Sequence, residues 1–182
     1  MRTDPARCFG SIVAGLGVGG ALAITGWFAI GPDHIIYAVV VQCGFLLMAL
    51  LAGPAVVDVA RSRYQVANIE PRIYTLLGAE VVRRVLDGVG WNRVIKQMRQ
   101  SEGGESGVAG FLRGTEQSET GHLLGAAATV ALAITAVSTH HPLGAVQVLA
   151  LGLVLHGYPI MIQRIVRARI TQRRTHRYRT TH

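Results

Sequence analysis

A carboxylate and an imidazole stand three residues apart near the middle of the chain, at Glu119 and His122. Residues with this spacing share one face of an α-helix. The pair lies where a polar, arginine-rich segment gives way to an apolar run. Such a pair can transfer a proton, bind a cation or anchor a helix end at a membrane surface. Glu119 and His122 are therefore the first candidates for catalytic residues.

The composition is that of a membrane protein. Half of the 182 residues are hydrophobic, and only 15% are charged, against about 25% in soluble domains. Several runs approach the roughly 20 apolar residues that are needed to cross a bilayer. The fold class expected is an all-α integral membrane protein that forms one membrane domain over residues 1–182.

Four transmembrane helices account for the apolar runs. They are expected over residues 8–30, 34–57, 122–139 and 143–162. The first run follows a basic start, as in a signal peptide, but it is too long and lacks a small-residue cleavage site. Small residues spaced by four, at Gly15 and Gly19 and again at Gly121, Gly125 and Thr129, predict faces where helices approach closely.

Arginine dominates the positive charge and predicts the orientation. All 18 basic residues lie in the first seven residues, the segment 61–121 or the tail 163–182, and the two short turns carry none. Positive charge collects on cytoplasmic loops. We therefore expect a multi-pass protein of the cell membrane with both termini and the 61–121 segment in the cytoplasm. This topology explains the positive charge without a nucleic-acid partner.

The long segment 61–121 contains two expected interfacial helices. Apolar residues recur with helical spacing over residues 72–86 and again over 91–98, which is typical of amphipathic helices on a membrane surface. Residues 101–110 are rich in glycine and predict a flexible loop, with a lid as the alternative.

Ionisable residues gather at the expected cytoplasmic ends of the spans. Asp58 ends the second span, Glu119 and His122 open the third, and Arg164 closes the fourth. His156 lies about two helical turns deeper than Arg164. Four helices in up-and-down order would bring these groups into one pocket. The alternative is that each is an ordinary interfacial group or makes a structural hydrogen bond.

Neither a metal nor a nucleotide cofactor is expected. Carboxylate-bridged metal bundles use an E-x-x-H motif from each of two helices, and this chain has one, at Glu119–His122. The glycine-rich string Gly15–Gly20 lies inside an apolar run with no strand before it, so it does not predict a nucleotide loop.

Two sequence elements resemble a known family. Thr115–His122, T-E-Q-S-E-T-G-H, resembles the T-x-A-E-x-x-H element of the glycosyl-diaponeurosporenoate acyltransferase family, small membrane proteins of carotenoid glycolipid synthesis. His156–Ile170 is similar to that family's N-x-Y-P-x-x-x-Q-R-Y-N-R-x-R-L, and Glu70–Gly78 to its entry into the cytoplasmic segment. His156 replaces the family's asparagine, and Ile165–Val166 replaces a tyrosine–asparagine pair.

The resemblance implies transfer of an acyl chain, from an acyl-CoA-like donor, to a lipid or glycolipid hydroxyl at the cytoplasmic face. His122 would be the general base, Glu119 would orient it, and the acyl chain would lie between the third and fourth spans. Arginines would hold an anionic headgroup or the donor's phosphates. The predicted substrate-binding residues are Arg113, His156, Tyr158, Gln163, Arg164, Arg167 and Arg169.

A non-catalytic reading is the main alternative. The glycine faces and the small size also suit a transmembrane subunit that binds lipid or assembles within a larger membrane complex. A small transporter component is a further alternative, although the chain has no visible internal repeat. Membrane lipids are the expected partners in each case, and a membrane-protein partner or a homo-oligomer stays open.

Overall fold

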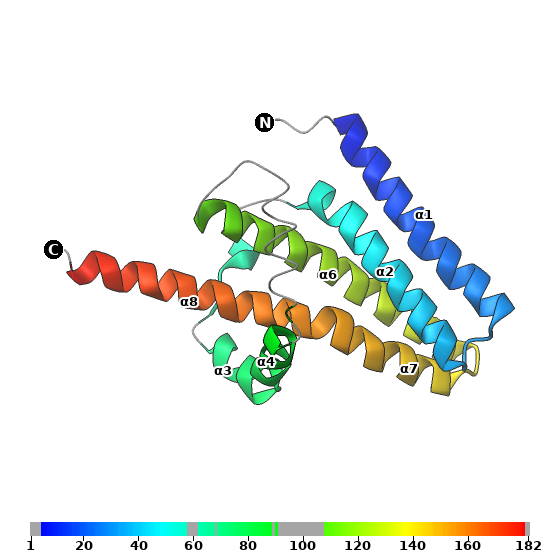
Figure 1. Cartoon of the computed structure of the whole chain (residues 1–182). Coiled ribbons are helices and arrows are strands. Elements are labelled where there is room, and N and C mark those ends of the chain that lie inside the picture. Colours follow the sequence, from blue (N-terminus) through cyan, green and yellow to red (C-terminus); the bar gives the residue numbers. More distant parts are fainter. Residues whose placement is uncertain (1–4, 58–61, 68, 89, 91–107, 181–182) are drawn as a thin grey trace. The chain divides into compact units, whose positions relative to one another are not determined.

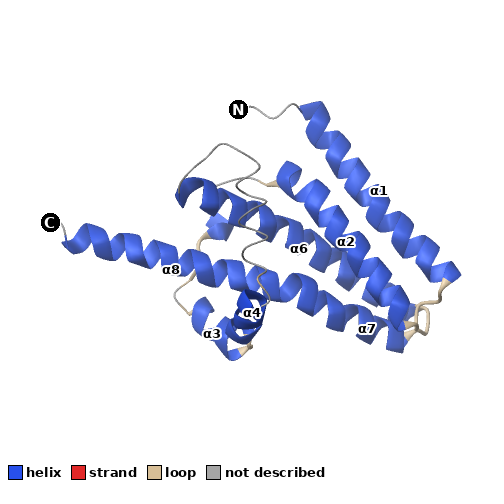
Figure 2. Ribbon diagram, viewed as in Figure 1, coloured by secondary structure: helices blue, strands red, loops and turns tan. Residues whose placement is uncertain are grey.

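The computed structural model describes residues 5–57, 62–67, 69–88, 90 and 108–180. Every regular element within these ranges is a helix (Figures 1 and 2). The predicted all-α fold is therefore confirmed. The chain divides into two compact units, one formed by residues 1–59 and 116–160 and the other by residues 60–115 and 161–182.

Four helices are long and apolar enough to span a membrane, as the sequence predicts. The candidate spans are Cys8–Ala29, Ile35–Val56, Arg113–Ser138 and Pro142–Thr171. The first three spans lie in α1 (Pro5–Ala29), α2 (Ile35–Val56) and α6 (Val108–Ser138). The fourth span runs through three consecutive elements, which are α7 (Pro142–Gly152), a π-helical turn (Leu153–Gly157) and the first part of α8 (Tyr158–Thr180).

The third and fourth helices are longer than the apolar runs within them. The third begins at Val108 instead of near residue 122, and the fourth continues to Thr180. Arginine, glutamate and glutamine are good helix formers, and neither polar flank contains proline. Helical hydrogen bonding therefore begins before the apolar run of the third helix and continues beyond the apolar run of the fourth.

The predicted amphipathic helix over residues 72–86 is wrong in one respect, because it is broken in two. α3 covers Glu70–Leu76 and α4 covers Ala79–Gly88. Gly78 between them has φ +84°, a left-handed conformation that glycine adopts without strain and that ends a helix. Val81 and Val85 of α4 are exposed, as suits a membrane surface. The helix predicted over 91–98 lies outside the described residues, as do residues 101–107.

Small residues bring helices of the first unit into close contact, as predicted. A Cβ added to Gly15 would lie 3.1 Å from the Met48 carbonyl oxygen of α2. One added to Gly121 of α6 would lie 2.7 Å from the Ala49 carbonyl oxygen. A Cβ would clash outright at Gly121 and would be crowded at Gly15, so these glycines allow α6 and α1 to pack closely against α2.

The two short turns of the first unit are fastened to each other. Asp33 accepts the Gly144 amide N–H at 2.9 Å, and its other oxygen lies 2.7 Å from Nδ1 of His141. The hydrogen bond with His141 holds the pKa of the Asp33 carboxyl below its usual value. The His141 ring also meets the Trp27 ring edge to face, with centroids 5.5 Å apart. These contacts tie the α1–α2 hairpin to the α6–α7 hairpin at their turns.

Candidate active site

The fourth span is interrupted by a π-helical turn over Leu153–Gly157. The Tyr158 amide N–H bonds to the Leu153 carbonyl, five residues back. Pro159 has no amide N–H for the α-helical bond to the Leu155 carbonyl, and its ring crowds that carbonyl. The helix therefore widens for one turn, and such π turns occur frequently at functional sites.

The π turn places His156 against His122 of α6. The two Nδ1 atoms are 3.3 Å apart, and the ring centroids are 5.5 Å apart. The His122 ring also makes a hydrogen bond with the backbone carbonyl of Leu155. His156 is fully buried, and His122 is partly exposed. Two of the predicted site residues, separated by 34 positions in the sequence, are thus in direct contact.

Gly125, three residues after His122, makes room for this contact. A Cβ at this position would lie 2.2 Å from Cε1 of His156. The Gly125 carbonyl accepts a hydrogen bond from the Thr129 hydroxyl at 2.8 Å, and Gln42 of α2 donates to Thr129 at 3.1 Å. This buried polar chain fixes the rotation of α6 and therefore the direction in which His122 points.

Glu119 lies one helical turn before His122 and is 2% exposed. The structure gives the His122 ring the partners His156 and Leu155. The sequence pattern favours Glu119 as the group that orients His122, a role that stays a prediction, and does not indicate the contact between His122 and His156. Two features of the sequence are consistent with the imidazole pair once the structure is known. They are Gly125, one turn after His122, and Pro159, three residues after His156.

The second unit contains the five remaining predicted residues Arg113, Gln163, Arg164, Arg167 and Arg169, and within it Arg164 forms a two-point ion pair with Glu70. The Arg164 Nε and Nη2 atoms lie 2.7 and 3.0 Å from the two Glu70 oxygens. Tyr74 and the Ala67 amide also donate to this carboxylate. Arg164, predicted to bind an anionic substrate, thus has a carboxylate partner within its own chain. The Arg164 guanidinium holds the pKa of Glu70 at about 2.

This low pKa predicts an acid-sensitive second unit. A folded-state pKa of about 2, against an ordinary 4.5, means stability that is fully present above pH 4.5 and lost as the pH falls towards 2. Glu70→Gln should therefore lower the free energy of unfolding by about 1–3 kcal/mol at pH 7, since the pair is partly buried. The deficit should shrink as the pH falls, which hydrogen exchange of α3 amides in detergent would measure. A deficit constant between pH 5 and pH 2 would contradict it.

The remaining arginines differ in how far they are exposed. Arg167 is 4% exposed, and its guanidinium carbon lies 5.4 Å from the centroid of the Tyr64 ring. Arg169 pairs with Glu80 at 3.2 Å through a half-exposed side chain, and Arg113 is exposed. Tyr158, in the first unit, and Gln163, in the second, are each half-buried. Binding of substrate by these residues stays a prediction, as does one pocket shared with Glu119 and His122.

Most of the chain matches the model of one protein family. The family model for glycosyl-4,4'-diaponeurosporenoate acyltransferase matches residues 60–176. This chain belongs to that acyltransferase family. The matched region includes every predicted site residue and begins after the second span. Neither the curated proteins nor the solved structures contain a match.

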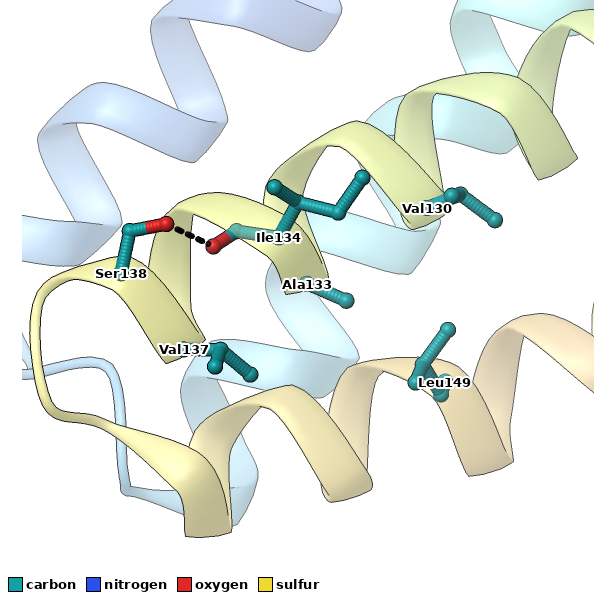
Figure 3. Close-up of a pocket in the computed structure, with 6 residues that line it drawn as sticks. All are labelled: Val130, Ala133, Ile134, Val137, Ser138 and Leu149. Atoms are coloured by element: carbon teal, nitrogen blue, oxygen red, sulfur yellow. Dashed lines mark hydrogen bonds between the residues drawn. The ribbon is translucent and has the colours of Figure 1, made fainter.

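An acyltransferase that works in a membrane has to hold an acyl chain, and an apolar groove lies between α6 and α7. Its volume is about 270 Å³, and Figure 3 shows the residues that line it. The lining residues are Val130, Ala133, Ile134, Val137, Ser138 and Leu149. The Ser138 hydroxyl donates to the Ile134 carbonyl at 2.8 Å, so its hydrogen is already bonded. Ala133 is about three helical turns from His122, which places both on one face of α6.

Within the described residues, histidine, cysteine, aspartate and glutamate side chains nowhere gather in threes. Both cysteines, Cys8 and Cys43, are free thiols. The ionisable groups that the structure brings into direct contact at the site are the imidazoles of His122 and His156.

Proposed function

We propose that this protein transfers an acyl chain to a hydroxyl group of a membrane lipid or glycolipid, with His122 as the general base. The observation that carries the proposal is the His122 ring itself. It is held by a second imidazole and a backbone carbonyl on a membrane-spanning helix of an acyltransferase family member. A fixed, partly exposed imidazole is the side chain best suited to proton transfer near neutral pH.

In the proposed reaction, His122 carries one proton from the acceptor hydroxyl to the leaving thiolate. His122 takes the proton of the acceptor hydroxyl while the acceptor oxygen attacks the carbonyl carbon of an acyl thioester. The tetrahedral intermediate then expels the thiolate, which receives the proton back from the imidazolium. Glu119, one turn away and buried, would stabilise the positive charge that His122 carries between these steps.

The proposed donor is an acyl-CoA-like thioester that reaches the site from the cytoplasm. The charge distribution supports this side, because basic residues are confined to the two ends of the chain and the segment 61–121. Arg113 and Arg169 are the exposed arginines best suited to phosphate groups of the donor or the acceptor headgroup. The same distribution supports a place in the cell membrane with both termini cytoplasmic.

The α6–α7 groove is the proposed site of the acyl chain, and blocking it should change chain selectivity. Val130→Trp fills the groove from the side nearer His122, so we expect products with shorter acyl chains and a lower rate with long-chain donors. Val13→Trp on α1 is the matched control, because Val13 and Val130 are 52% and 49% exposed and only Val130 lines the groove. Lipid mass spectrometry would read the chain lengths. An unchanged profile would place the chain elsewhere.

The function as a whole is tested by comparing lipids made with and without the protein. Purified protein in nanodiscs receives isotope-labelled acyl-CoA and a lipid extract from its own membrane. Labelled ester or acylated glycolipid detected by mass spectrometry supports the proposal. If no labelled lipid forms, and if Glu119→Gln and His122→Asn restore growth or lipid composition as fully as the native chain, a non-catalytic subunit is the better description.

A further inference from the structure

His156 is the one fully buried imidazole of the described chain, and the reaction outlined above leaves it without a task. We propose that His156 is the positioning residue of His122. It accepts a hydrogen bond from Nδ1–H of His122 and thereby leaves the His122 Nε2 lone pair free to act as the base. The inference rests on the proposed function for the role of His122, although the hydrogen bond itself can be tested without any assay of activity.

The geometry around His122 favours one tautomer. Two groups face its ring, namely Nδ1 of His156, 3.3 Å from Nδ1 of His122, and the Leu155 carbonyl. Both come from adjacent positions of the π turn, so they approach the ring together. A carbonyl can only accept, so His122 must present an N–H towards this segment. In the proposed arrangement this N–H is on Nδ1, the nitrogen that lies against His156, which leaves Nε2 unprotonated.

In the part of the chain that the structure describes, the surroundings of His156 leave its ring one hydrogen-bonding contact, which is the contact with His122. The side chain is fully buried, and Nε2 has no hydrogen-bond partner among the described residues. The hydrogen bond that the structure gives its ring goes to His122. Buried polar atoms are normally satisfied, so an imidazole with one unsatisfied nitrogen is kept at a cost in stability. The contact with His122 is the interaction that explains why a histidine is kept at this position.

Complete burial also separates this role from substrate binding. A side chain with no exposed surface touches its protein neighbours and not a lipid in an open groove. The His156 ring fills the space where a Cβ at Gly125 would lie, and its backbone belongs to the widened turn Leu153–Gly157. A rigid neighbour of this kind reduces the number of His122 orientations that must be sampled before reaction.

Two isosteric substitutions separate positioning from packing. Asparagine in His156→Asn has an oxygen as many bonds from the backbone as Nδ1 of histidine, so it can accept the same hydrogen bond. Leucine in His156→Leu has the same shape as asparagine but cannot accept one. We expect His156→Asn to keep most of the transfer rate, and His156→Leu to lower kcat by about a hundredfold with little change in KM.

A spectroscopic measurement decides the matter independently of catalysis. In full-length protein with ¹⁵N-labelled histidine, the native chain and His156→Asn should show His122 with its proton on Nδ1. His156→Leu should show a larger fraction of His122 with its proton on Nε2, because only the Leu155 carbonyl then favours a proton on Nδ1. A proton on Nε2 of His122 in the native chain, or identical spectra for the two variants, would overturn the proposal. If the native chain makes no product while the tautomers differ as expected, the positioning role stands and the acyltransferase function fails.

Discussion

Replacing His122 by asparagine is expected to lower acyl transfer by about 10²–10⁴-fold, the range typical of losing a general base. The asparagine amide nitrogen lies about where Nδ1 lies, so it can still donate to His156 or to the Leu155 carbonyl. Nothing in asparagine replaces Nε2. The substitution therefore removes the base and keeps the hydrogen bond that orients α6 against the π turn.

The initial rate of labelled acyl incorporation in nanodiscs measures this effect. His140→Asn is the matched control, because His140 is exposed in the turn between α6 and α7 and its φ of +65° suits asparagine as well as histidine. We expect the control to keep the native rate. A folded His122→Asn protein that transfers acyl chains at the native rate would show that another group removes the proton.

Replacing Gly125 by valine is expected to disrupt the first unit more than any surface change. The new Cβ would lie 2.2 Å from Cε1 of His156, far inside contact distance, and the ring is fully buried. Overpacking of this kind costs about 1–3 kcal/mol or more. Thermal unfolding in detergent should show a midpoint several degrees lower, and a smaller fraction of monodisperse protein.

Gly20→Val controls for the poorer helix propensity of valine, because nothing lies within 4 Å of a Cβ at Gly20 on α1. We expect that variant to melt near the native protein. The double variant Gly125→Ala with His156→Ala should recover stability relative to Gly125→Ala alone, since the ring that causes the clash is gone. Equal destabilisation at Gly20 and Gly125 would mean that the clash is relieved by an easy movement of the ring.

The sequence by itself determined the parts of this protein that depend on local chemistry. An apolar run of about 20 residues is long enough to cross a bilayer as a helix, so the four membrane-spanning helices could be predicted from hydropathy alone. Glycines spaced by four predicted the close contacts at Gly15 and Gly121, because only a missing side chain lets two helical backbones touch. The break at Gly78 was missed because helical periodicity in the flanking residues outweighed a single glycine.

Tertiary structure alone decided which polar groups meet. Glu119 and His122 are neighbours on one helix, and from sequence the nearest carboxylate is the natural partner for an imidazole. The structure gives His122 a partner 34 residues away, and gives Arg164 a carboxylate 94 residues away at Glu70. Such pairs depend on the rotation of each helix about its axis, which hydropathy leaves open. Here that rotation is set by close packing at Gly121 and Gly125 and by the widened turn that precedes Pro159.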